Sequence, residues 1–165
     1  MKELILIRHA KSSWSNPLLE DFERPLNKRG AKNAPFMAKI LKQKEVNPDL
    51  IISSPSKRTK DTLDFFMKEF DYKGEIIFEE SIYEAPYITI LKVIKNIDDK
   101  HKTIFLFGHN PGLNDLADFL LGRFEENIPT CGVLKLNFNI SKWEDIKEKI
   151  GILEFFIYPK MFDKS

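Results

Sequence analysis

The pattern of apolar positions along the chain predicts six strands, four of them buried. Four short runs rich in isoleucine, leucine and phenylalanine are bounded by polar or turn residues, which is typical of strands covered on both faces. These runs fall in residues 3–7, 47–54, 75–83 and 102–109. Two later segments, 132–140 and 151–159, alternate apolar and polar residues in part, so we expect them to close the sheet as an antiparallel pair.

Between these runs, apolar residues recur at helical spacing. Asn27 is placed to cap a helix over residues 28–43. Five side chains of this helix are expected to face inward: Ala31, Ala34, Met37, Ala38 and Leu41. A second helix is predicted to begin at Ser54–Pro55, a third to span residues 88–97, and a fourth to run from Asn110–Pro111 through Leu121. The second and third helices are expected to bury two sets of residues: Thr62, Leu63, Phe66 and Phe70, and Ile90, Val93, Ile94 and Ile97.

Strands that alternate with helices predict a three-layer α/β/α fold with a mainly parallel central sheet. No stretch of residues 1–165 has the composition of an interdomain linker, so we expect a single domain. Residues 14–27 contain two prolines and no periodicity, and we expect a loop there. Ligands of such sheets bind beyond the carboxyl ends of the strands. Functional residues are therefore expected where the apolar runs stop.

Cations and imidazoles stand at those ends. Arg8 and His9 follow the first apolar run, His109 follows the fourth, and Arg58 lies about one turn into the helix after the second. The planar N–H donors of two guanidinium groups match the oxygens of a phosphate dianion, and helix N-termini add partial positive charge. A neutral imidazole is a nucleophile near neutral pH, and a second imidazole can donate to a transferring phosphoryl group. Together the four residues predict a phosphate site.

Composition excludes several other classes. The 26 basic and 25 acidic side chains give a net charge of +1, which argues against a general nucleic-acid binder. No apolar run approaches the ~20 residues of a membrane span, and the one cysteine, Cys131, fits a reducing cytoplasm. A cysteine phosphatase would need an arginine where Asn137 stands, so Cys131 is expected to be a small buried residue. Without a P-loop or a histidine pair at zinc-binding spacing, we expect no nucleotide, metal or other cofactor.

Several motifs, taken in order, resemble the histidine phosphatase superfamily, whose members include phosphoglycerate mutase. The signature stretches are LIRHAKSSW, SSPSKRTKDT and GHNPG. The small size and the stretches ERPLNKRG, IYEAP and PTCGVLKLNF are similar to the short SixA-type phosphohistidine phosphatase branch. The resemblance covers nearly the whole chain and implies a phosphoglycerate mutase-like version of the α/β fold.

The resemblance implies a role for each matching residue. His9 is the nucleophile that takes the phosphoryl group, Arg8 and Arg58 bind its oxygens, and His109 stabilises the transition state. Thr62 matches a threonine that we expect to pack and hydrogen-bond behind the site.

The sequence also departs from the family's pattern. Ala10 replaces a frequent glycine, and Lys11 replaces a frequent glutamate. Ser15 falls where many members have a phosphate-contacting asparagine, and Asn16 lies one residue away. Alongside Arg8 and Arg58, the expected substrate-binding residues are Lys11, Ser15 and Arg24, although a surface ion pair explains Arg24 about as well.

A general acid is the least certain part of the resemblance. Glu80, Glu84 and Asp21 are the nearest candidates, and each is expected to be an ordinary solvated carboxylate. The remaining assignments are a solvated loop position for His101, the pocket mouth for Trp14 and a packing role for Trp143.

Three functions remain open at this stage. The leading hypothesis is a metal-independent phosphohydrolase that forms a phosphohistidine intermediate and dephosphorylates phosphohistidine on a protein. The second is a phosphatase of a small phosphomonoester, and the third is a non-catalytic phosphate-binding module. We expect a phosphorylated protein or small molecule as partner, no nucleic acid, no membrane, and a cytoplasmic monomer, with the oligomeric state left open.

Overall fold

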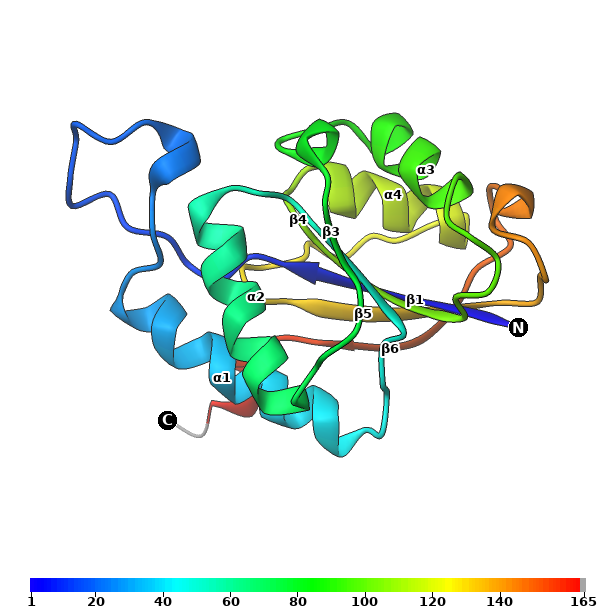
Figure 1. The fold of residues 1–165 in the computed structure, drawn as a ribbon, viewed down its shortest axis with the longest axis horizontal. Coiled ribbons are helices and arrows are strands. Elements are labelled where there is room, and N and C mark those ends of the chain that lie inside the picture. Colours follow the sequence, from blue (N-terminus) through cyan, green and yellow to red (C-terminus); the bar gives the residue numbers. More distant parts are fainter. Residues whose placement is uncertain (164–165) are drawn as a thin grey trace.

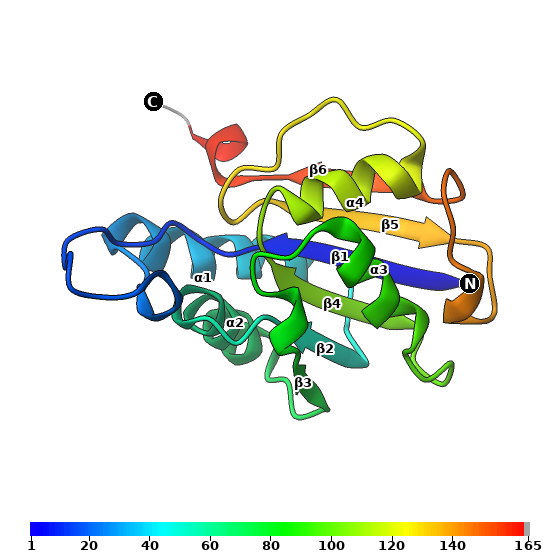
Figure 2. The same cartoon turned by 90° about the horizontal axis from the view of Figure 1, so that it is seen from above.

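A computed structural model describes residues 1–163, whose strands form one six-stranded sheet in the order β3-β2-β4-β1-β5-β6. The strands are β1 (Lys2–Arg8), β2 (Leu50–Ser53), β3 (Ile76–Phe78), β4 (Thr103–Gly108), β5 (Val133–Phe138) and β6 (Ile152–Ile157). The first four strands are mutually parallel where they pair, whereas β5 runs antiparallel to both β1 and β6. The predicted mainly parallel sheet with an antiparallel closing pair is confirmed (Figure 2).

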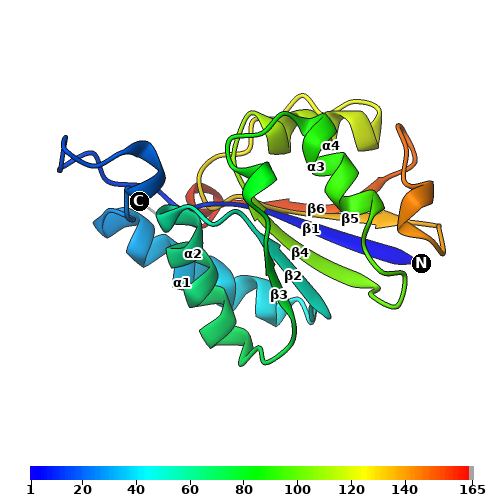
Figure 3. The ribbon, with the colours of Figure 1, turned by 45° about the horizontal axis from the view of Figure 1, so that its top comes forward.

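Four helices complete the three layers. They are α1 (Lys28–Gln43), α2 (Lys57–Phe70), α3 (Tyr87–Lys95) and α4 (Gly112–Leu121). Helices α1 and α2 cover one face of the sheet, and α3 and α4 cover the other (Figures 1 and 3). Successive side chains of β1 serve the two cores in turn, because strand side chains alternate between faces: Leu4 and Leu6 join one cluster, Ile5 and Ile7 the other. No helix within residues 1–163 is long and apolar enough to cross a bilayer.

The helix starts differ in part from the prediction. The side chain of Asn27 accepts from the N–H of Gly30 at 2.8 Å, so the predicted cap of α1 is confirmed. Helix α2 begins later than Ser54–Pro55, because the N–H of Ser54 donates to the Phe107 carbonyl at 3.0 Å and keeps the chain extended. Ser56 is its N-cap.

Helix α4 likewise begins at Gly112 rather than at Pro111, while the Asn110 side chain accepts from the N–H of Asn114 at 3.0 Å. The buried faces follow the predicted spacing with three differences. Phe70 and Val93 are half-buried, and Ala31 is exposed while Gly30 is buried in its place.

Gly30 is buried because α1 passes close to the chain that follows β1. A Cβ atom at Gly30 would lie 2.2 Å from the Lys11 carbonyl oxygen, a backbone atom that cannot swing away. The same carbonyl accepts from the N–H of Asn27 at 3.0 Å. Glycine at this point therefore fixes the distance between α1 and the segment that leaves His9.

Gly30→Ala is expected to destabilise the fold by about 1–3 kcal/mol, since the added methyl overpacks a backbone contact. Urea denaturation gives the free energy of unfolding. The neighbouring exposed Ala31→Ser variant is the control and should stay within about 0.5 kcal/mol of the wild type. Equal stability of Gly30→Ala and wild type would show that the contact is not tight.

Candidate active site

The ends of β1 and β4 bring two histidines together. Arg8 and Gly108 are register partners at the carboxyl ends of these parallel strands, and the N–H of His9 donates to the Gly108 carbonyl at 3.1 Å. His9 and His109 follow these ends, and their ring centroids lie 5.2 Å apart. Both rings are buried, with exposed fractions of 7% and 1%. A phosphoryl group bound at His9 would therefore lie beside His109.

Hydrogen bonds fix the tautomer and position of His9. Its Nδ1 lies 2.8 Å from the Ala10 carbonyl oxygen, which can only accept, so in the neutral ring Nδ1 carries the proton. The unprotonated Nε2 then accepts a long hydrogen bond from Nε–H of Arg58, at 3.4 Å. Behind the ring, Thr62 accepts from the N–H of Ala10 at 2.9 Å and donates to the Arg58 carbonyl at 2.8 Å. Thr62 thus lies where the family resemblance places it and joins β1 to α2.

Both imidazoles are held neutral. Burial, followed by the charges of Arg58, Arg8 and Arg24, lowers the pKa of His9 to about 4. Burial, followed by His9 and Arg58, lowers the pKa of His109 to about 3. Since an unperturbed histidine titrates near ~6.5, His9 is available as a nucleophile throughout the neutral range.

These shifts predict that the protein loses stability between about pH 6.5 and pH 5. The unfolded chain takes up protons on both histidines in this window, whereas the folded chain does not, so acid favours unfolding. Each ring contributes at most about 1.4 kcal/mol per pH unit. Urea denaturation at several pH values measures the slope, and His109→Asn should flatten it. A wild-type stability independent of pH in this window would contradict the burial of neutral rings.

Arg58 is almost fully buried, at 2% exposure, and two carboxylates bind it. Its guanidinium donates to the Asp21 carbonyl at 2.7 Å, to the Asp21 carboxylate at 3.0 Å and to the Glu84 carboxylate at 2.6 Å. Glu84 also lies 3.3 Å from Nδ1 of His109. Asp21 and Glu84 are exposed to solvent, as expected, but each also forms an ion pair with Arg58, which the sequence did not predict. Glu80 is exposed and contacts none of these groups.

The carboxylate of Asp21 joins two arginines. It accepts from Arg58, from Arg24 at 2.9 Å, and from the hydroxyl of Tyr83. Burial alone would raise the pKa of Asp21, but hydrogen bonds from Tyr83, Arg24 and Arg58 outweigh it and lower the pKa to about 2. Asp21 is thus ionised at neutral pH and positions cations rather than holding a proton.

Two further arginines complete a cationic wall. Arg8 donates to the Ile128 carbonyl at 2.9 Å, and its Nε is buried without a protein partner. Arg24 is buried, donates to the Ser13 carbonyl at 3.0 Å, and stacks with its guanidinium carbon 3.2 Å from the centroid of the Trp14 ring. Arg24 therefore reaches the site as well as forming an ion pair.

Most of these groups line an open hollow of about 290 Å³, whereas His109 is buried and does not line it. Its lining consists of Arg8, His9, Lys11, Ser12, Trp14, Asp21, Arg24, Arg58, Glu84, Asn110 and Thr130. Lys11 and Trp14 thus line it as expected. Ser15 does not, because its hydroxyl bonds that of Ser13 at 2.8 Å on the exposed loop; Asn16 instead accepts from the N–H of Leu18 at 3.1 Å. The arrangement of two neutral imidazoles and three guanidiniums can bind and transfer a phosphoryl group.

Comparison with known proteins decides the family. A model of the histidine phosphatase superfamily (branch 1) matches residues 4–88, which include His9, Arg58 and Glu84. The chain belongs to the histidine phosphatase superfamily. An uncharacterized chloroplastic protein of Arabidopsis thaliana is 33% identical over 153 residues, 87% of this chain and 70% of its own length. An uncharacterized protein of Mycobacterium tuberculosis is 26% identical over 164 residues, 93% of this chain and all of its own length.

Solved structures place this histidine phosphatase beside the SixA type. The candidate phosphohistidine phosphatase SixA of Agrobacterium tumefaciens has a TM-score of 0.82 and 26% identity, covering 96% of this chain and 98% of that one. The protein histidine phosphatase SixA complexed with tungstate has a TM-score of 0.84 at 16% identity, covering 98% and 99%, which shows the shared fold. The chain is a phosphatase of this superfamily with the phosphoglycerate mutase-like α/β fold, and it is similar to proteins of the SixA type.

Sequence reasoning missed several residues at this histidine phosphatase site. Ser54 Oγ lies 2.7 Å from Nε2 of His109, and the Thr59 hydroxyl lies 3.5 Å from the same atom. Ser54 follows β2, so the rule that located His9 and His109 at strand ends applies to it too. Tyr83 packs its ring 5.3 Å from that of His109, and no sequence pattern predicts this contact.

Cys131 lies behind the site as a buried, structural residue. Its N–H donates to the carbonyls of Arg8 and His9 at 3.1 and 3.0 Å, and burial raises the pKa of its thiol to about 12. The prediction that Cys131 is a small buried residue is confirmed.

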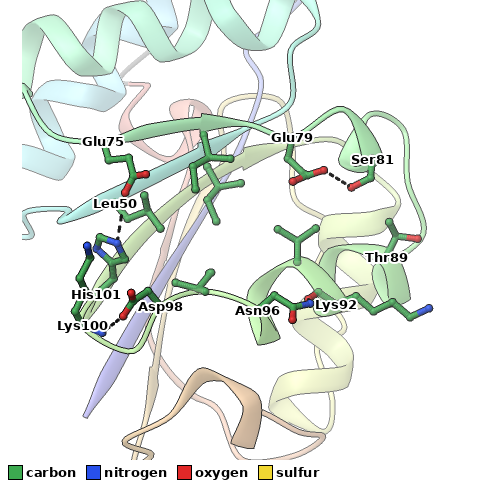
Figure 4. A pocket seen from close by; sticks show the side chains of 14 residues that line it. Leu50, Glu75, Glu79, Ser81, Thr89, Lys92, Asn96, Asp98, Lys100 and His101 are labelled. Atoms are coloured by element: carbon green, nitrogen blue, oxygen red, sulfur yellow. Dashed lines mark hydrogen bonds and ion pairs between the residues drawn. The ribbon is translucent and has the colours of Figure 1, made fainter.

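The third histidine lies elsewhere in this histidine phosphatase. A second hollow, of about 550 Å³ between β2, β3 and α3, has His101 at one end and contains none of the four predicted catalytic residues (Figure 4). His101 is buried at 9% exposure, between Asp49 and Glu75 at 3.6 Å each, so its expected solvated position was wrong. Its carbonyl accepts from the Trp143 indole at 2.8 Å, and fully buried Trp143 is a packing residue as predicted.

Proposed function

We propose that this protein is a metal-independent phosphohydrolase that removes the phosphoryl group from phosphohistidine on a protein. The observation that carries the proposal is His9, whose protonated Nδ1 leaves Nε2 unprotonated and held only by a long hydrogen bond from Arg58. In the first step Nε2 attacks phosphorus, the bond to the leaving group breaks, and His9 carries the phosphoryl group. Water then attacks this phosphohistidine, which releases phosphate and restores the imidazole. Arg8, Arg58 and His109 hold the oxygens during both steps.

The leaving group favours a phosphorus–nitrogen bond. A phosphomonoester must expel an alkoxide, whose conjugate acid has a pKa near that of water, ~15.7. Phosphohistidine expels an imidazole, which accepts a proton with a pKa near ~6.5 and so leaves readily. Asp21 holds no proton at neutral pH, and Glu84 is bound to Arg58. A site with its cations in place and its carboxylates paired suits the better leaving group.

One observation favours the second candidate, a phosphatase of small phosphomonoesters. Glu84 borders the hollow and lies beside both Arg58 and His109. When a phosphoryl group takes its place on Arg58, this carboxyl group is near enough to carry a proton to a leaving oxygen. Such help from a general acid is typically worth ~10² to 10⁴ in rate.

A substrate series separates the two candidates. We expect kcat/KM to be highest for a phosphohistidine peptide, lower for p-nitrophenyl phosphate and lowest for a sugar phosphate, in the presence of a chelator throughout. Glu84→Gln should lower turnover of the sugar phosphate by about 10² and spare the phosphohistidine peptide. Glu80→Gln is the matched control at an exposed carboxylate.

Two results would overturn the proposal. Turnover of the sugar phosphate as fast as that of the phosphohistidine peptide would favour the small-molecule phosphatase. Loss of all activity in chelator, with recovery on adding a divalent metal, would contradict metal independence. We also propose that the substrate is a protein, that the enzyme acts in the cytoplasm, and that Arg8, His9, Arg58 and His109 have the roles given above.

A further inference from the structure

The loop that leads from His9 to α1 carries three exposed apolar side chains beside the hollow. Trp14, Leu18 and Phe22 have exposed fractions of 77%, 91% and 39%. We call these three residues the apolar rim. The loop projects beyond the end of the sheet and then leads into α1 (Figures 1 and 2). Scattered apolar residues are normal on a surface, but three within nine positions at the mouth of a site are not scattered.

Hydrogen bonds hold this loop in one shape. At its base, Ser12 pairs with Leu26 in an isolated bridge, and the N–H of Ser13 donates to the Pro25 carbonyl at 2.8 Å. At its tip, Asn16 accepts from the N–H of Leu18 at 3.1 Å through its side chain and from that of Leu19 at 3.3 Å through its carbonyl. The apolar rim is therefore presented in an ordered form, which lowers the entropy lost on binding.

Two contacts tie the rim directly to the phosphate-binding groups. Trp14 stacks on the buried guanidinium of Arg24 and lines the hollow. Phe22 packs edge-on against Tyr83, with ring centroids 5.1 Å apart, and Tyr83 bonds Asp21. A molecule whose phosphoryl group enters the hollow therefore has Trp14 beside it.

A small phosphorylated metabolite offers nothing to such a rim. The hollow of about 290 Å³ admits a phosphoryl group and the side chain that carries it, so the rest of a larger substrate stays outside. Exposed tryptophan, leucine and phenylalanine gain free energy only against apolar surface. The occupant must therefore bring apolar side chains close to its phosphoryl group.

The charges beside the rim give the occupant an orientation. Arg8, Arg58 and Lys11 line the hollow, whereas Glu20 and Glu23, on the same loop as Leu18 and flanking Phe22, are exposed. A complementary partner places its phosphoryl group inward, apolar residues next to it, and basic residues beyond them.

We propose that the apolar rim is the docking surface for the protein substrate, and that it selects a phosphohistidine flanked by apolar and then basic side chains. This inference rests on the proposed function and adds to it the surface that chooses among phosphoproteins. Leu18 is its specificity-determining residue, since it lies outside the hollow and contacts no group of the phosphate site.

Two short synthetic peptides test the proposal. Both carry one phosphohistidine and terminal lysines; leucines flank the phosphohistidine in one, and serines in the other. Wild type is expected to prefer the leucine peptide by about tenfold in kcat/KM, the size of effect that burial of one leucine supports. Leu18→Ser should reduce this preference to less than about threefold and leave hydrolysis of phosphoramidate unchanged.

Ile152→Ser is the matched control. Ile152 is 68% exposed on β6 and pairs with Asn137 at the amino end of β1, far from His9 along that strand. It should behave as wild type with both peptides. The docking-surface proposal is wrong if Leu18→Ser keeps the full preference for the leucine peptide, or if wild type hydrolyses both peptides without a preference. The proposed function is unaffected by either result. If wild type hydrolyses p-nitrophenyl phosphate but neither peptide nor phosphoramidate, the proposed function is wrong. The docking-surface proposal is then wrong as well, because it depends on that function.

Discussion

His9→Ala abolishes the phosphoenzyme and lowers kcat by about 10⁴ or more, since removing the nucleophile leaves only binding and electrostatic help. The enzyme is incubated with radiolabelled substrate and quenched under alkaline conditions, because a phosphoimidazole does not survive acid. Wild type should carry label, and His9→Ala should carry none. This expectation follows from the unprotonated Nε2 of a ring that is oriented by the Ala10 carbonyl and kept neutral by burial.

The matched control for this experiment is the histidine outside the site. His101→Asn removes an imidazole that lies between Asp49 and Glu75, and it should retain both label and turnover. Label that persists in His9→Ala would assign the nucleophile to another residue. A wild-type enzyme that binds phosphate mimics but never becomes labelled would favour the non-catalytic phosphate-binding module.

Arg58→Ala is expected to lower kcat/KM by about 10³ and to weaken competitive inhibition by vanadate. Without the guanidinium, Glu84 would lose its ion-pair partner and Asp21 would keep only Arg24, so both carboxylates would repel the phosphoryl group. Arg58→Lys should recover little, because a lysine cannot reproduce the planar set of donors.

Lys57→Ala controls for the loss of one positive charge on the same helix. Lys57 is exposed and pairs with Asp61 at 2.7 Å, outside the hollow, so turnover and vanadate inhibition should match wild type. Unchanged inhibition in Arg58→Ala would show that Arg8 and Arg24 suffice to bind the phosphoryl group.

The meeting of His9 and His109 could be predicted from the sequence because it depends on a general rule. Parallel strands end at one edge of a sheet, and two apolar runs that each stop at a histidine give the positions. Arg58 followed from its place near the start of a helix that leaves the same edge. The positions of His9, His109 and Arg58 thus follow from the periodicity of strands and helices, which is visible in short stretches of sequence.

The positions of Asp21 and Glu84 could not be predicted in this way. Asp21 begins a three-residue 3-10 helix and Glu84 lies in a turn, and both segments are too short for a periodic pattern to fix the direction of a side chain. Their place depends on ion pairs with Arg58 from a distant helix. Ser15 does not line the hollow for a similar reason, since local hydrogen bonds to Ser13 determine the shape of its loop. Gly30 replaced Ala31 in the core because a close backbone approach outweighed the apolar pattern.

The pairing of Arg58 with Asp21 and Glu84 also determines how readily the enzyme lets go of its product. In the resting protein these two carboxylates act as built-in competitors for the cation that binds phosphate. An arriving phosphoryl group must exchange places with them, and a large substrate has additional contacts with which to drive the exchange. Free phosphate has none, so the carboxylates return and expel it. We therefore expect the ion pairs of Arg58 with Asp21 and Glu84 to limit inhibition of the enzyme by its own product.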